Sequence, residues 1–94
     1  MSENYHDPKV FGPVFWKTYD IVAATYPKHP DKKERAAAKM FFQSQKYLIP
    51  CTVCAHHYRK IYKNYPPRLE SRTTLMAWVD MVKAKVAEHM AKDK

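Results

Sequence analysis

The sequence predicts an all-α protein, a four-helix bundle, from three features of its 94 residues. Gly12 is the only glycine, whereas a β-rich fold of this size would need glycine at many tight turns. Apolar residues recur every three or four positions, the period of a helix that is buried on one face. Prolines divide these runs into four segments joined by short loops, which indicates an antiparallel bundle. We expect an N-terminal tail over 1–8, a helical domain over 9–92 and a C-terminal tail over 93–94.

The first two segments both carry helix-start signals. Pro13 lies near the beginning of the first segment, and proline suits the first turn of a helix because its missing N–H costs nothing there. This segment ends at Tyr26-Pro27. The second begins after Asp31, an N-cap residue with Glu34 three positions on, and stops near Pro50. Their apolar stripes are Phe11, Val14, Phe15, Ile21 and Val22, and then Met40, Phe41, Tyr47 and Leu48.

The third and fourth helices follow the same pattern. The third begins at or just after Pro50 and ends before Pro66-Pro67. Either Ser71 or Thr73 can cap the fourth helix. The stripe of that last helix is Leu75, Trp78, Val79, Val82, Val86 and Met90.

Composition narrows the class of protein. A hydrophobic content of 46%, with 14% aromatic residues, indicates a folded chain. The net charge is +8, but the lysines are spread through every segment, which favours a solvated exterior over a nucleic-acid partner. No stretch approaches about 18 consecutive apolar residues, so we expect no membrane-spanning segment. Residues 1–9 lack the apolar core of a signal peptide, so we expect no secretory export.

The two cysteines, Cys51 and Cys54, are the main candidates for chemistry. Two intervening residues on a helical turn bring their sulfurs within bonding distance. Pro50 helps to place Cys51 at a helix N-terminus, where unpaired N–H groups favour a thiolate. Cys51 is therefore the expected exchanging thiol, with Cys54 one turn inward and the His56-His57 doublet as a further source of positive charge.

Other uses of the pair are less favoured. A structural disulfide usually closes a longer loop. A zinc site needs four ligands, and Cys51, Cys54 and one histidine of the doublet supply three, so we expect no metal. Haem attachment requires histidine where Ala55 stands, and a thioredoxin site requires a βαβ unit. A redox pair on a helical scaffold is the favoured interpretation.

Three stretches resemble the Erv/ALR family of FAD-dependent sulfhydryl oxidases. Gly12-Pro13-Val14-Phe15-Trp16, followed by Ala23-Ala24-Thr25-Tyr26-Pro27, is similar to the family's opening helix. The stretch from Ile49 to Tyr58 resembles its Pro-Cys-X-X-Cys-X-X-His-aromatic core. Ser71-Arg72 and Trp78 fall where its last long helix begins. The resemblance covers about residues 9 to 92.

The resemblance implies a helical bundle, often dimeric, that holds FAD between its helices. Cys54 would face the flavin, and Cys51 would exchange with substrate thiols. Family positions that line or grip the cofactor map onto Gly12, Trp16, Tyr26, His57 and Trp78, with Lys92 as a phosphate-facing lysine.

Two departures from the family pattern weaken the expected hold on FAD. The family's His-Asn-X-X-Asn signature is replaced here by Lys83-Ala84-Lys85-Val86-Ala87, and its first-helix histidine by Asp20. Lys83 and Lys85 are candidates to meet the pyrophosphate instead.

Two functions follow from these expectations. The first is an FAD-linked thiol oxidase that forms disulfides with oxygen as acceptor. Its substrate would be a thiol-bearing protein or a small thiol, because the chain has no second cysteine pair to act as a shuttle. The alternative is a degenerate structural subunit of a larger assembly, a mitochondrial complex or a virion. Both a homodimer and a larger complex stay open, and disulfide chemistry favours the mitochondrial intermembrane space or a virus-associated pathway.

Overall fold

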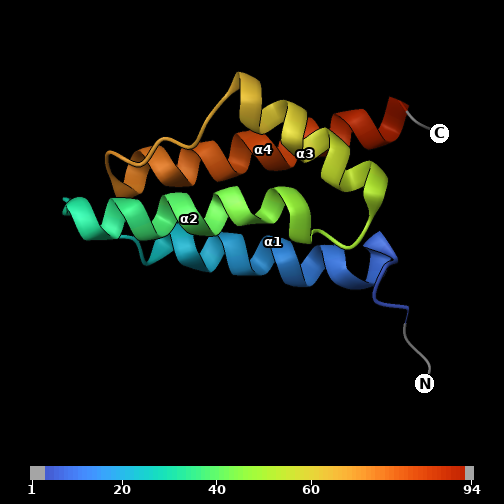
Figure 1. The fold of residues 1–94 in the computed structure, drawn as a ribbon, viewed down its shortest axis with the longest axis horizontal. Coiled ribbons are helices and arrows are strands. Elements are labelled where there is room, and N and C mark those ends of the chain that lie inside the picture. The colour runs from blue at the N-terminus through green and yellow to red at the C-terminus, as the bar shows by residue number, and fades with distance from the viewer. Residues whose placement is uncertain (1–3, 93–94) are drawn as a thin grey trace.

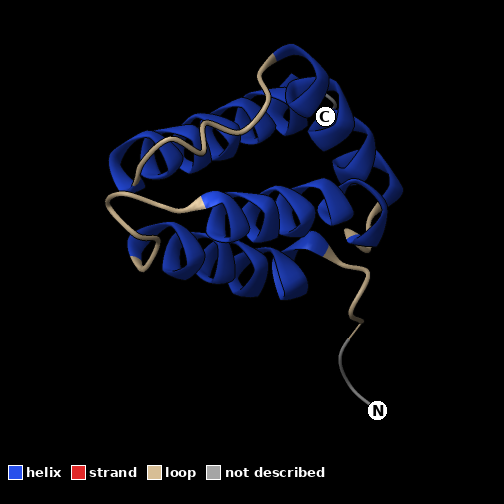
Figure 2. Cartoon of the chain, turned by 60° about the vertical axis from the view of Figure 1, so that its left-hand side comes forward, coloured by secondary structure: helices blue, strands red, loops and turns tan. Residues whose placement is uncertain are grey.

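The structure, a computed structural model, describes residues 4–92 and contains four helices and no strand within that range. Figure 1 shows α1 (Pro8–Ala24) beside α2 (Lys32–Leu48), with α3 (Thr52–Asn64) and α4 (Arg72–Lys92) forming the other side of the bundle. The two pairs are stacked as layers in Figure 2. Side chains of α4 pack on α1 and α3, and those of α3 pack on α2. The predicted all-α four-helix bundle is confirmed.

The first helix begins earlier than the sequence pattern predicted. Asp7 is its N-cap and accepts a hydrogen bond from the backbone N–H of Lys9 at 2.9 Å. Pro8 therefore occupies the first-turn position expected for Pro13, which instead lies inside α1 with an exposed side chain. Residues 4–7 form a turn rather than an extended tail, since the N–H of Asp7 donates to the carbonyl of Asn4 at 3.0 Å.

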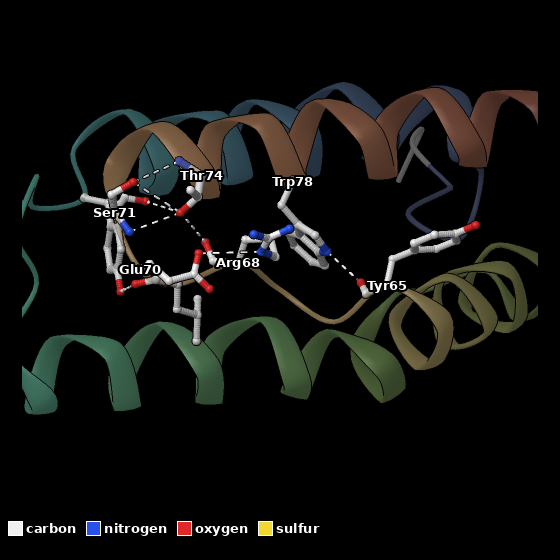
Figure 3. Close-up of polar contacts among 8 residues, drawn as sticks. Tyr65, Arg68, Glu70, Ser71, Thr74 and Trp78 are labelled. Atoms are coloured by element: carbon white, nitrogen blue, oxygen red, sulfur yellow. Dashed lines mark hydrogen bonds and ion pairs between the residues drawn. The ribbon is translucent and has the colours of Figure 1, made fainter.

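Two other helix starts match their predicted caps. At α2, the N–H of Glu34 donates to the Asp31 carboxylate at 2.8 Å, and the N–H of Asp31 donates to Glu34 at 2.9 Å. At α4, the N–H of Thr74 donates to the hydroxyl of Ser71 at 3.2 Å, so Ser71 rather than Thr73 is the cap (Figure 3).

The core is built from aromatic and branched side chains of all four helices. Its most deeply buried large members are Phe42, Tyr58, Leu75, Val79 and Val82. The hydroxyl of Tyr58 donates to the carbonyl of Phe42 at 2.6 Å, which ties α3 to α2. In Figure 3 the indole N–H of Trp78 points to the carbonyl of Tyr65, 2.7 Å away, and fixes the chain just after α3 against α4.

Across the described residues, no helix combines the length and the apolar character needed to cross a bilayer.

Candidate functional site

The cysteine pair lies at the head of α3. Cys51 is the N-cap of this helix, and its sulfur accepts a hydrogen bond from the backbone N–H of Cys54 at 3.3 Å. Both residues are free thiols. Cys51 is half-buried, whereas only 8% of Cys54 is exposed. The outer sulfur is therefore the accessible one, and the inner sulfur is shielded one turn further along the helix.

Burial sets the protonation of the inner thiol. Loss of solvent around Cys54 raises its pKa to about 12, and the neighbouring thiol of Cys51 acts in the same direction through its hydrogen bond and charge. At neutral pH Cys54 is therefore protonated in this state. In the reduced pair, the thiol that an incoming molecule can reach is that of Cys51.

Cys54 opens onto a cavity of about 230 Å³ between the N-terminal half of α1 and the C-terminal half of α4. Its lining comprises Pro8, Phe11, Gly12, Phe15, Trp16 and Tyr19 around α1, Ile49 and Tyr58, and Lys83, Val86, Ala87 and Met90 of α4. The wall is thus mostly aromatic and aliphatic, with one cation, Lys83.

Three sequence-predicted cofactor residues meet at this cavity. Gly12 and Trp16 lie on its α1 wall and Lys83 on its α4 wall, all lining the same space as Cys54. A Cβ atom built on Gly12 would have no neighbour within 4 Å, so the glycine leaves open space at the wall. The ring of Trp16 packs edge-to-face on Tyr19, with centroids 5.6 Å apart, which fixes its orientation.

Lys83 is held in place by an acidic residue of α1, Asp20. Its ammonium donates to both carboxylate oxygens of Asp20, at 2.8 and 3.0 Å. The two side chains are 39% and 41% exposed, so the pair lies at the rim of the bundle rather than in its core. The ion pair fixes a lysine side chain at the cavity wall.

Four other predicted cofactor residues lie elsewhere. The hydroxyl of Tyr26 donates to the carbonyl of Leu69, and Trp78 is packed in the core, so neither lines the cavity. His57 is buried, and its ring lies 4.7 Å from that of His89 on α4. Lys92 ends α4, and its side chain lies outside the described part of the structure.

Lys85, the second candidate for pyrophosphate, also faces away from the cavity. Its ammonium lies over the ring of Tyr65, 4.7 Å from the centroid. Of the two substituted lysines, only Lys83 is placed to contact a molecule bound beside Cys54.

The residues present fit the ring end of a flavin. The cavity is apolar, adjoins the Cys54 thiol and is smaller than the roughly 300 Å³ at which pockets for whole small molecules begin. It therefore suits a flat ring system better than a complete dinucleotide. Gly12, Trp16 and Lys83 are the residues best placed to hold such a group.

Sequence reasoning missed three contributors to this site. His6, in the turn before α1, lies with Nδ1 2.9 Å from the carbonyl of Pro50, next to Cys51. Because a carbonyl only accepts, Nδ1 carries the proton in this contact. Ile49 and Met90 read as ordinary core positions, yet they line the cavity. No local sequence signal marks a contact between residues 44 positions apart.

The described residues 4–92 hold no group of three or more His, Cys, Asp or Glu side chains placed to bind a metal ion.

Known proteins with similar sequences share one description. A model of the Erv1 / Alr family matches residues 13–94. The FAD-linked sulfhydryl oxidase ERV2 of Saccharomyces cerevisiae is 32% identical over 85 residues, covering 90% of this chain and 43% of the relative. The putative FAD-linked sulfhydryl oxidase 347L of Invertebrate iridescent virus 6 is 38% identical over 58 residues, covering 62% of this chain and 52% of the relative.

The fold agrees with these relatives. The crystal structure of the yeast Erv1 core superposes with a TM-score of 0.86 at 28% identity, covering 90% of this chain and 72% of that one. The chain spans about half the length of the curated relatives that it matches. The motif resemblance, the family match and the shared bundle agree, and the chain belongs to the Erv1/Alr family.

Proposed function

We propose that this chain is an FAD-linked thiol oxidase that forms disulfides in partner thiols and uses oxygen as the acceptor. The observation that carries the proposal is the placement of the pair: Cys51 is accessible at the head of α3, and Cys54 adjoins the aromatic cavity. The names of the relatives support the same class of activity.

The chain's part in the reaction is thiol–disulfide exchange. A substrate thiolate attacks Cys51 of the oxidised pair, a mixed disulfide forms, and the sulfur of Cys54 leaves with the electron pair. A second substrate thiolate then attacks the substrate sulfur, releasing the substrate disulfide and the thiol of Cys51. Two electrons have then reached the pair, which is the free-thiol state of the structure.

The burial of Cys54 favours the next step, the transfer of the electron pair out of the reduced cysteine pair. The surroundings that raise the pKa of Cys54 also destabilise its thiolate, which favours passing the electron pair to an acceptor in the cavity. Bound FAD would supply that two-electron acceptor and hand the electrons to oxygen, giving hydrogen peroxide. Gly12, Trp16 and Lys83 would hold it, while contacts from Tyr26, His57, Trp78 and Lys92 stay predictions.

Substrate and setting are part of the proposal. The substrate is a protein thiol or a small thiol that meets Cys51 directly, and nucleic acid is no partner of the site. Relatives named mitochondrial or viral support a mitochondrial intermembrane or virus-associated setting. A homodimer or a larger complex is compatible with the fold.

The test combines a spectrum with a matched pair of variants. The purified chain, supplied with FAD, should show flavin absorption bands and consume oxygen when a thiol is added. Cys54→Ser should abolish that uptake and keep the flavin bands, and Ser44→Cys, on the exposed side of α2, serves as a cysteine control with unchanged uptake. Normal turnover by Cys54→Ser would refute the proposal.

The degenerate structural subunit is the second candidate, and the Asp20–Lys83 pair is what favours it. Because Lys83 is already neutralised by a carboxylate, it offers less charge to a phosphate. A folded protein that stays colourless with excess FAD, and that co-purifies in a large particle, would support this alternative.

A further inference from the structure

The net positive charge of the chain comes mainly from the segment that includes the cysteine pair. No acidic residue occurs between Glu34 and Glu70. The same interval contains seven basic residues: Arg35, Lys39, Lys46, Arg59, Lys60, Lys63 and Arg68. The other ten of the 17 basic residues nearly balance the nine acidic ones. Almost the whole net charge therefore resides in the part of the chain that includes α3 and most of α2.

Four exposed residues form the outer face of α3. Val53, His56, Lys60 and Lys63 follow one another at helical spacing on the side opposite the buried Cys54 and Tyr58. Cys51 stands at the head of this row. Leu48, which ends α2 shortly before Cys51, is 63% exposed, and Val53 is 46% exposed. We call Leu48, Val53, His56, Lys60 and Lys63 the Cys51 face.

Four of these cations, Lys46, Arg59, Lys60 and Lys63, are not paired with carboxylates among the described residues. Among the described residues, Lys60 and Lys63 form no ion pair. Lys46 lies over the ring of Tyr62, 4.1 Å from its centroid, and Arg59 over that of Tyr47. Such contacts orient a cation and leave its charge in place.

An acidic residue does occur close by, at Asp7. It adjoins His6, which contacts the carbonyl of Pro50. Its carboxylate is already engaged as the cap of α1, where it accepts from the N–H of Lys9. The side of Cys51 that continues along α3 is therefore cationic.

We propose that the Cys51 face docks an acidic protein segment that carries the cysteine to be oxidised. Charge complementarity selects acidic residues in that segment. The exposed apolar side chains of Leu48 and Val53, flanking Cys51, suit a peptide better than a nucleic acid backbone. The inference names the substrate class of the same site and rests on the proposed oxidase for the later fate of the electrons.

The spacing of the face fixes where the acidic residues should lie. Lys60 follows Cys51 by nine positions, about 14 Å along a helix. An extended peptide covers that distance in about four residues. A segment that runs along α3 should therefore carry its acidic residues four to five positions from its cysteine.

The test uses thiol exchange alone and needs neither flavin nor oxygen. In the Cys54→Ser variant, the thiolate of Cys51 attacks the peptide sulfur of a peptide–thionitrobenzoate disulfide. A peptide–Cys51 disulfide forms and the coloured thionitrobenzoate thiolate leaves, so the rate is read from absorbance. Two peptides of equal length are compared, with either glutamates or lysines four and five positions from their single cysteine.

At low salt we expect the acidic peptide to react at least about tenfold faster, and the two rates to converge as salt screens the charges. Lys60→Glu with Lys63→Glu should remove the preference. The control is Lys32→Glu with Lys33→Glu, which makes the same change in net charge at the start of α2. In Figure 1 this lies at the opposite end of the bundle from the start of α3, which Cys51 caps. The control should keep the preference.

Equal rates for the two peptides, or an equal loss in both double variants, would overturn the inference. So would a single-stranded oligonucleotide that displaces the acidic peptide at physiological salt through Lys60 and Lys63. Because flavin takes no part in the exchange, failure here leaves the oxidase proposal standing. Conversely, if the oxygen-uptake test fails, the preference of Cys51 for thiol peptides with acidic residues can still be measured.

Discussion

Asp20 on α1 and Lys83 on α4 form an ion pair with two contacts, at 2.8 and 3.0 Å, at the rim of the bundle. In the motif resemblance, each takes a position that the Erv/ALR pattern gives to a histidine, in the opening helix and in the His-Asn-X-X-Asn signature respectively. The structure places these two side chains together as a pair of opposite charges. Substituting either one alone leaves a charge without its partner.

A double-mutant cycle should detect this coupling. Asp20→Ala and Lys83→Ala, made singly and together and measured by urea unfolding, should give a coupling of up to about 1 kcal/mol, because each side chain is well exposed to solvent. The control is the pair of Arg68 and Glu70, 3.6 Å apart and 67% and 63% exposed, for which we expect almost no coupling. Equal coupling in both cycles would mean that the Asp20–Lys83 pair has no special role.

Substitutions at Gly12 should affect the stability of the fold and the affinity for FAD in different ways. Gly12→Ala should raise the free energy of unfolding by about 0.5 to 1 kcal/mol, because glycine in a helix interior is costly and an added Cβ meets nothing within 4 Å. Gly12→Leu should keep the fold and lower the affinity for FAD, since its side chain would occupy part of the cavity. Thermal unfolding without FAD and a flavin fluorescence titration measure the two effects. Unchanged FAD affinity in Gly12→Leu would place the flavin elsewhere.

The raised pKa of Cys54 gives a dependence of stability on alkaline pH. The folded state holds this proton more tightly than the unfolded chain, whose thiol has a pKa of 9.0. The stabilisation is thus complete below pH 9 and is lost as the pH rises from 9 towards about 12. The free energy of unfolding, measured with urea, should fall between pH 8 and pH 10.5 in both variants. The fall should be larger in Cys51→Ser than in Cys51→Ser/Cys54→Ser. The double variant corrects for the lysines and tyrosines that titrate in the same range.

Tyr58 anchors α3 to α2 next to the cavity. Tyr58→Phe removes the hydroxyl that donates to the carbonyl of Phe42 at 2.6 Å, and should cost about 1 kcal/mol of unfolding free energy. Tyr47→Phe is the matched control, because that side chain is 76% exposed and its loss of a hydroxyl should be nearly neutral. Equal stabilities of the two variants would show that the buried hydrogen bond contributes nothing.

The helices and the cysteine site followed from local signals. Asp31 and Glu34 form the reciprocal cap that their spacing predicted, and Pro50 places Cys51 at the start of α3. These features depend on residues within one turn of each other, so the sequence displays them directly. The predicted start of the first helix near Pro13 was wrong because a second start signal, Asp7-Pro8, lies five residues earlier, in the segment that was predicted to be a tail.

The remainder depends on pairs of residues that are distant in the sequence. Asp20 and Lys83 are 63 positions apart, and no periodicity relates them. Apolar stripes likewise do not distinguish a core position such as Val82 from a cavity wall such as Val86. Lysines occur in every segment, so their spread alone did not reveal a cationic region; the absence of acidic residues between Glu34 and Glu70 is the more informative pattern.

The sulfur of Cys51 has two roles, because it caps α3 and is also the proposed point of attack by substrate thiols. Carboxymethylation or a mixed disulfide at this sulfur changes the hydrogen-bond acceptor of the Cys54 backbone N–H. Because that hydrogen bond caps the helix, the first turn of α3 should then open more often. Exchange of that one amide proton with deuterium should therefore quicken when Cys51 is modified. The opening turn of α3 would then report, at a single backbone position, whether the chain is engaged with a thiol.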